Sequence, residues 1–294
     1  MSASNRAAVI QKCHKVLRKH YQAVSPPERS VLEHLHYACC LENAPYEKAD
    51  EAFARVQATY FEWNEVRVTS VSELAEEMAA LPDPQVAVTN LKRLLQSVFE
   101  AYYDWDYLET LKKQNLGKAV ADLQKHAGVS PFVLAYGTQA ALGGHSIPLD
   151  RGALEVLLIL GLINEKEAAA ANCPGLERAI PKNKGVEFGS LLHQLGADLL
   201  ASPYSPQVRA ILLEIEPEAK DRLPKRSRKG SDEAEAAEPE PKAKPAAEPA
   251  APKKKAAKKK PAAETPKPKK KAATKKSSGA KKSATKKLTK KKPK

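Results

Sequence analysis

Hydrophobic residues recur every three to four positions along much of this chain, which is the spacing of one face of an α-helix. No run of alternating β-branched and polar residues competes with this pattern, so no sheet is expected. The sequence therefore predicts an all-α fold. The residues with helical spacing are Phe53, Val56 and Tyr60; Leu91, Leu94, Leu95, Val98, Phe99 and Tyr102; Phe188, Leu191, Leu192, Leu195 and Leu199; and Val208, Ile211, Leu212 and Ile215.

Clusters rich in proline, glycine, serine and asparagine separate the predicted helices and mark turns. These clusters are Ser25-Pro26-Pro27, Pro82-Asp83-Pro84, Gly143-Gly144 and Asn172-Cys173-Pro174-Gly175. The resulting body, residues 1–224, is long enough to bury a substantial core as one large domain or as two lobes that share an interface. We expect a two-lobed helical bundle.

The helical pattern stops at Pro224, where the charge balance also changes. Residues 225–294 carry 26 Lys and Arg against 7 Asp and Glu, a net charge of +19. Residues 1–224 carry 23 against 28, a net charge of −5. A segment rich in lysine, alanine and proline buries too little apolar surface to offset its chain entropy. We therefore expect residues 225–294 to form a disordered tail.

The tail has the composition of a nucleic-acid-binding arm. Residues 252–294 contain 20 lysines and a single acid, Glu264. Lysines placed near phosphates release condensed counterions, so binding should be strong at low salt and weaken steeply as salt rises. No aromatic residue is present to stack on bases, so sequence selectivity should be weak. The expected contacts are Lys253, Lys254 and Lys255; Lys258, Lys259 and Lys260; and Lys269, Lys270 and Lys271.

The tail resembles those of linker histones and the lysine/alanine/proline arms of bacterial nucleoid proteins. This resemblance implies double-stranded DNA as the partner and a cytoplasmic, nucleoid-associated location, or the nucleus in a eukaryote. RNA remains an alternative, because a lysine-rich arm cannot distinguish the two nucleic acids. A solubilising or membrane-binding role is disfavoured, because the tail has no lipidation signal and no amphipathic apolar face.

The sequence shows neither a membrane-spanning segment nor a secretion signal. No stretch approaches the roughly 20 apolar residues that cross a bilayer, and no apolar signal-peptide core follows the first residues. The cysteines, Cys13, Cys39, Cys40 and Cys173, have the spacing of neither a zinc site nor a disulfide framework. We expect buried, reduced thiols in a cytosolic protein.

Residues 116–163 carry the most specific pattern in the body. They predict a helix, a short turn at Gly128-Val129-Ser130, a second helix from Pro131, and a third that follows Asp150. The hairpin and the Pro148-Leu149-Asp150-Arg151 segment resemble the two motifs of helix-hairpin-helix DNA glycosylases of the endonuclease III type. The order of helices extends this resemblance to 31–107 and 189–196.

The resemblance implies that Lys125 and the backbone of Gly128, Val129 and Ser130 bind a DNA phosphate. A target base would rotate out of the stack into a pocket between two lobes. Asp150 would stabilise positive charge as the glycosidic bond breaks, or activate the nucleophile. Two structural alternatives stay open, because Asp150 can simply cap a helix and Gly128 can simply serve a turn. His126 and His145 are expected to be structural.

Several departures from the family pattern narrow the expected chemistry. Phe132 stands where bifunctional members have a lysine, so no lyase step is expected. Pro131 removes one N–H donor from the hairpin, and no glutamine occurs at Leu41-Glu42, where many members insert one into DNA. Residues 200–217 contain no cysteine for an iron–sulfur loop, so no cofactor is expected.

The sequence thus predicts a DNA-binding protein of the base-excision-repair type. It is either a monofunctional glycosylase that uses Asp150 or a degenerate DNA-binding relative, with the tail as a nonspecific tether. A histone-like nucleoid protein without enzymatic activity and an RNA- or ribosome-associated factor remain alternatives. The acidic body argues against a broadly basic DNA face, unless its lysines gather on one side. These lysines are Lys112, Lys113, Lys118 and Lys125. The lesion and the oligomeric state stay open.

Overall fold

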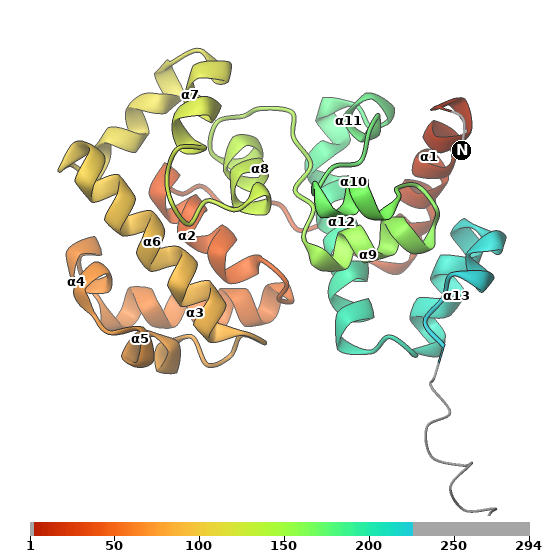
Figure 1. Ribbon diagram of the computed structural model, residues 1–294, viewed down its shortest axis with the longest axis horizontal. Helices are drawn as coiled ribbons and strands as arrows, with labels where there is room; N and C mark the ends of the chain where they lie inside the picture. The colour runs from red at the N-terminus through yellow and green to blue at the C-terminus, as the bar shows by residue number, and fades with distance from the viewer. Residues whose placement is uncertain (1–2, 226–294) are drawn as a thin grey trace, which may run out of the picture. The chain divides into compact units, whose positions relative to one another are not determined.

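The computed structural model describes residues 3–225, which form helices joined by loops, with no strand in that range (Figure 1). The all-α prediction is confirmed. The nine tail lysines named above, and the predicted tail from residue 226 onward, lie outside the described residues.

The helices pack around two hydrophobic cores, so the predicted two-lobed bundle is confirmed (Figure 1). The first lobe contains α2 (Val31–Leu41), α3 (Tyr46–Thr59), α4 (Trp63–Val68), α5 (Val71–Glu77), α6 (Pro84–Tyr102), η1 (Asp106–Lys113), α7 (Leu116–Leu123) and α8 (Pro131–Ala140). The second contains α1 (Ala3–His20), α9 (Arg151–Ile159), α10 (Glu165–Ala169), α11 (Leu176–Ala179), α12 (Lys182–Ala201), α13 (Pro206–Ile215) and η2 (Pro217–Asp221). The chain therefore begins in the second lobe, crosses over to build the first, and returns after α8.

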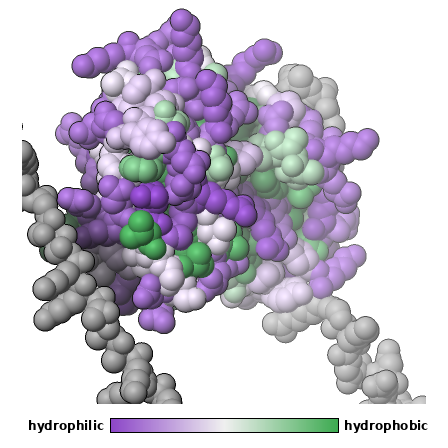
Figure 2. Space-filling model, turned by 60° about the vertical axis from the view of Figure 1, so that its left-hand side comes forward, coloured by the Kyte–Doolittle hydropathy of each residue, from purple (hydrophilic) through white to green (hydrophobic). Residues whose placement is uncertain are grey.

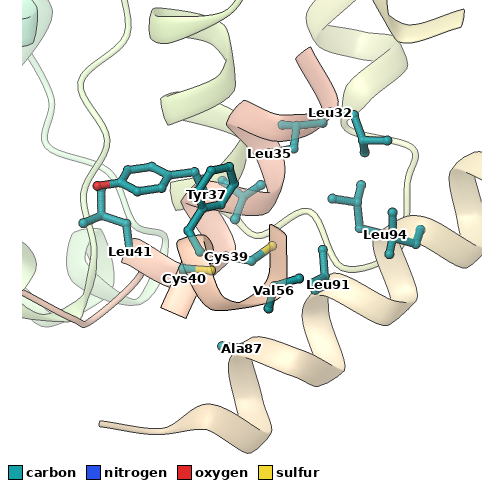
Figure 3. Close-up of a cluster of buried hydrophobic side chains, with 14 of the residues drawn as sticks. Leu32, Leu35, Tyr37, Cys39, Cys40, Leu41, Val56, Ala87, Leu91 and Leu94 are labelled. Atoms are coloured by element: carbon teal, nitrogen blue, oxygen red, sulfur yellow. The ribbon is translucent and has the colours of Figure 1, made fainter. Parts of the chain in front are cut away.

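Helix α2 is the centre of the first lobe. It begins with a capping box between Ser30 and Glu33, and every residue of the helix except Glu33 is buried. A helix that is apolar on all sides needs neighbours on all sides, and α3, α6 and α8 provide them. Figure 3 shows Cys39 and Cys40 among the leucines of this core. Burial raises the pKa of both thiols, and the predicted burial of free cysteines is confirmed.

The helical spacings read from the sequence correspond to buried faces. The predicted apolar positions of α12 and α13 are all buried, and so are those of α6 from Leu91 to Val98. One boundary differs from the prediction. Helix α3 ends at Thr59, and Tyr60 follows it with extended backbone as the C-cap residue.

The surface is mainly polar where Figure 2 shows it. Hydrophilic residues cover most of that face, and hydrophobic residues appear between them in small groups. Among residues 3–225, no helix combines the length and the apolar character that a membrane crossing requires.

Candidate active site and DNA interface

The loop between α7 and α8 forms the predicted hairpin. Gly128 has a φ of +87°, and Ser130 begins α8 by accepting a hydrogen bond from the Val133 N–H at 3.1 Å. The Val129 N–H is already used, because it donates to the His126 carbonyl. The N–H groups of Gly128 and Ser130 have no partner within the described residues. These two donors are available to a phosphate oxygen.

Gly128 also permits a close approach between the hairpin and α6. A Cβ at this position would lie 2.2 Å from the Asn90 carbonyl oxygen and 2.7 Å from the Leu94 nitrogen. No other residue type avoids that overlap. Glycine is therefore required at position 128 for two reasons, the positive φ of the turn and the close packing against α6.

Two of the lysines that could form a basic face on the body have acidic neighbours. Lys125 is largely exposed, and its Nζ lies 3.0 Å from Asp122. Lys112 is paired in the same way with Glu109, at 2.7 Å. Surface pairs of this kind are weak, so both lysines can still exchange their partner for a phosphate.

The two histidines expected from the sequence to be structural, His126 and His145, have structural partners. His126 contacts the Ser97 and Tyr102 hydroxyls, and burial lowers its pKa. His145 Nε2 lies 2.8 Å from the Glu177 carbonyl and 3.0 Å from that of Ile180.

Asp150 is the N-cap of α9, and its side chain is fully buried. Oδ1 accepts a hydrogen bond from the Ala153 N–H at 2.8 Å, and Oδ2 lies 3.2 Å from Nδ1 of His193 on α12. The capping role is thereby confirmed. The contact with His193 was not predicted from the sequence, which gave that histidine no role.

His193 links the two lobes. Its Nε2 lies 2.9 Å from the carbonyl oxygen of Ala44, in the loop after α2. Its ring centroid lies 5.1 Å from that of Tyr46 and 6.0 Å from that of Phe132. The histidine is buried, so both ring nitrogens depend on protein partners.

Two glycines bring Asp150 and His193 together. A Cβ on Gly152 of α9 would lie 2.6 Å from the Gly196 backbone, and a Cβ on Gly196 would lie equally close to Gly152 and Ala153. Gly152 comes two residues after Asp150, and Gly196 comes one helical turn after His193. The close crossing of α9 and α12 therefore sets the distance between the two side chains.

Gly196→Ala should lower the free energy of unfolding by about 2–3 kcal/mol, because the new methyl group overlaps backbone that cannot easily move. Gly189→Ala is a matched control in the same helix. Its Cβ would meet its nearest neighbour at 3.5 Å, so it should be neutral or stabilising by up to about 1 kcal/mol. Urea unfolding of both variants measures the difference. Equal stability of the two would show that the crossing is not tightly constrained.

Asp150 borders an open cleft of about 440 Å³. Glu42, Phe132 and Arg151 line it as well, and no lysine of residues 3–225 is among its lining residues. Glu42 Oε2 accepts a hydrogen bond from the Ser130 hydroxyl at 3.0 Å. Burial, followed by the nearby Asp150 charge, raises the pKa of Glu42. Two acidic residues in different environments thus border the cleft.

A second cavity of about 240 Å³ shares Phe132 with the cleft as a lining residue. Its wall includes Tyr37, Tyr46 and Tyr136, as well as His193. Phe132 is buried, so an apolar ring borders both cavities at the position where the resemblance would place a lysine.

No cluster of three or more metal-binding side chains occurs among residues 3–225. The expectation that the protein has no cofactor stays a prediction.

No protein-family model matches the sequence, and no curated protein is significantly similar to it. The structure is similar to two solved structures of endonuclease III with DNA. One is a trapped covalent intermediate, with 15% identity, a TM-score of 0.53, and coverage of 76% of this chain and 100% of that chain. The other is a non-covalent complex, with 16% identity, a TM-score of 0.54, and coverage of 76% and 99%. This chain has the endonuclease III fold. The resemblance stated from the hairpin and aspartate motifs is confirmed at the level of the fold.

Proposed function

We propose that this protein binds double-stranded DNA and removes a damaged or mismatched base from it as a monofunctional DNA glycosylase, with Asp150 as the active-site carboxylate. The observation that carries the proposal is the cleft of about 440 Å³ in which Asp150 lies beside the first residues of α8. The endonuclease III fold of the chain supports a DNA partner, because both similar structures contain endonuclease III with DNA.

In this proposal, each part of the site has a separate task. The free N–H groups of Gly128 and Ser130 hold a backbone phosphate, and the target base rotates into the cleft. As the glycosidic C–N bond breaks, its electron pair leaves with the base, and the sugar acquires positive charge that Asp150 stabilises. Water then adds to the sugar carbon and releases a proton. Because no lysine of the described helices lines the cleft, the proposed reaction forms no Schiff base and leaves the strand intact.

Asp150→Asn should slow base excision by at least about 100-fold, because the neutral amide cannot stabilise positive charge on the sugar. Asparagine is also a good N-cap residue, so the variant should remain folded, which thermal unfolding will check. The assay follows base release and strand cleavage on a panel of damaged and mismatched duplexes. Equal excision by wild type and variant would contradict the role of Asp150, and strand cleavage would contradict the monofunctional assignment.

The second candidate is a DNA-binding relative without enzymatic activity, and the complete burial of the Asp150 side chain favours it. A carboxylate that only caps α9 need never meet a substrate. On this reading the wild type excises no base from any duplex, and Asp150→Asn binds DNA with unchanged affinity.

A further inference from the structure

The hydrogen bonds of His193 restrict where its protons are. Nε2 lies 2.9 Å from the Ala44 carbonyl oxygen. A carbonyl oxygen can only accept, so Nε2 must carry a proton. In a neutral ring, Nδ1 would then be a bare lone pair.

That bare nitrogen would face a carboxylate oxygen. Nδ1 of His193 lies within ion-pair distance of Oδ2 of Asp150, at 3.2 Å, and neither atom has a hydrogen-bonding partner among residues 3–225. The side chains are 3% and 0% exposed, so water does not separate them. Two unprotonated acceptor atoms buried this close together are unfavourable, and one proton on either atom removes the conflict.

The surroundings favour placing that proton on the ring. Imidazole is the more basic of the two groups. The Ala153 N–H and the N-terminal end of α9 both stabilise a negative charge on Asp150. We propose that His193 is a doubly protonated positioning residue that keeps Asp150 ionised and fixed in the interior.

The other groups packed around the pair do not supply this charge. Tyr46 faces it from α3, and burial raises the pKa of Tyr46 to about 12, so that hydroxyl stays neutral. Glu42 at the end of α2 is acidic, Phe132 on α8 is apolar, and the Arg151 side chain is exposed. Within the described part of the chain, His193 is the basic group that lies within 4.0 Å of Asp150.

The loop after α2 makes the pair dependent on both lobes. Glu42 accepts a hydrogen bond from the hairpin residue Ser130, and the Asn43 side chain accepts one from the Arg151 N–H at 3.0 Å. Ala44 then binds His193. Asn43 has a left-handed backbone conformation, with a φ of +64°. At this bend the three consecutive residues 42–44 contact Ser130, Arg151 and His193 in turn. Contact between the lobes therefore positions the histidine that holds Asp150.

The protonation state can be measured in the free, full-length protein by ¹⁵N NMR of the histidine rings, with His193 assigned from the signal lost in His193→Gln. At pH 7 we expect both of its ring nitrogens to carry a proton. In Asp150→Asn the amide can donate to Nδ1, so the ring should become neutral with a bare Nδ1. Asp198→Asn on the same helix, where Asp198 binds the Tyr21 hydroxyl, should leave His193 unchanged. A bare Nδ1 in the wild type, or a doubly protonated ring in Asp150→Asn, would overturn the proposal.

The role in catalysis rests on the proposed function and has its own readout. In His193→Gln, the ¹³C signal of the Asp150 carboxyl at pH 7 should move away from the position of an ionised carboxylate. Excision should fall at least 100-fold at neutral pH, with DNA affinity unchanged. An Asp150 that stays ionised in His193→Gln would contradict the proposal. If the wild type excises nothing, the proposed function fails, and the NMR result on the free protein still decides the state of the pair.

Discussion

Ending the chain at Pro224 should lower its affinity for duplex DNA by about 1,000-fold or more at 50 mM salt. The reason is the charge distribution, because residues 225–294 hold a net charge of +19 and residues 1–224 hold −5. Each phosphate that a lysine neutralises contributes about −0.9 to the slope of log affinity against log salt. The full chain should therefore show a steep slope and the shortened chain a shallow one. Fluorescence anisotropy of a labelled duplex from 50 to 200 mM salt measures both quantities.

A charge variant separates the lysines from the length of the tail. Replacing the nine clustered lysines with glutamine, namely Lys253, Lys254, Lys255, Lys258, Lys259, Lys260, Lys269, Lys270 and Lys271, should reduce the affinity and the salt slope while the chain keeps its full length. Discrimination between damaged and intact duplexes should stay with residues 1–224. Full affinity in the shortened chain would show that the tail is not the main DNA-binding segment.

Gly128→Ala should lower the free energy of unfolding by about 3–4 kcal/mol. Part of this loss is the strain of a non-glycine residue at a φ of +87°, which is about 1–2 kcal/mol. The rest comes from a methyl group placed 2.2 Å from the Asn90 carbonyl oxygen, which forces the hairpin away from α6. Urea unfolding gives the difference between wild type and variant.

Gly143→Ala separates the two contributions. Its φ is +64°, and a Cβ there would meet nothing within 4 Å, so only the backbone strain of about 1–2 kcal/mol should appear. A loss in Gly128→Ala no larger than in Gly143→Ala would mean that the packing against α6 is not a constraint.

The sequence was sufficient for features that depend on local spacing. The apolar repeat of α12, the start of α8 at Ser130 and Pro131, and the capping role of Asp150 follow from residues within a few positions of one another. Hydrogen bonds at helix ends and buried helical faces are short-range properties, so a single sequence carries them.

Features that depend on contacts between distant segments could not be predicted in this way. The spacing of the leucines in α12 is enough to predict that helix, so His193 carries no signal of its own. No neighbouring residue in the sequence indicates that Asp150 and Ala44 are its partners. Gly152 and Gly196 each resemble an ordinary helical glycine until α9 and α12 are seen to cross there. Likewise, the sequence does not show that α6 packs too closely against Gly128 to leave room for a Cβ.

The path of the chain through the two lobes has a consequence for synthesis on the ribosome. Helices α2 to α8 can complete their core while later residues are still being added, but α1 packs against α11, α12 and α13. Lys19 of α1, for example, pairs with Glu214, which is 195 positions away. At about 5–20 residues per second, α1 waits about 10–40 seconds for that partner. During this interval its apolar residues, including Ile10 and Leu17, lack the complete core of the second lobe, so the nascent chain should be a target for chaperones until α13 emerges.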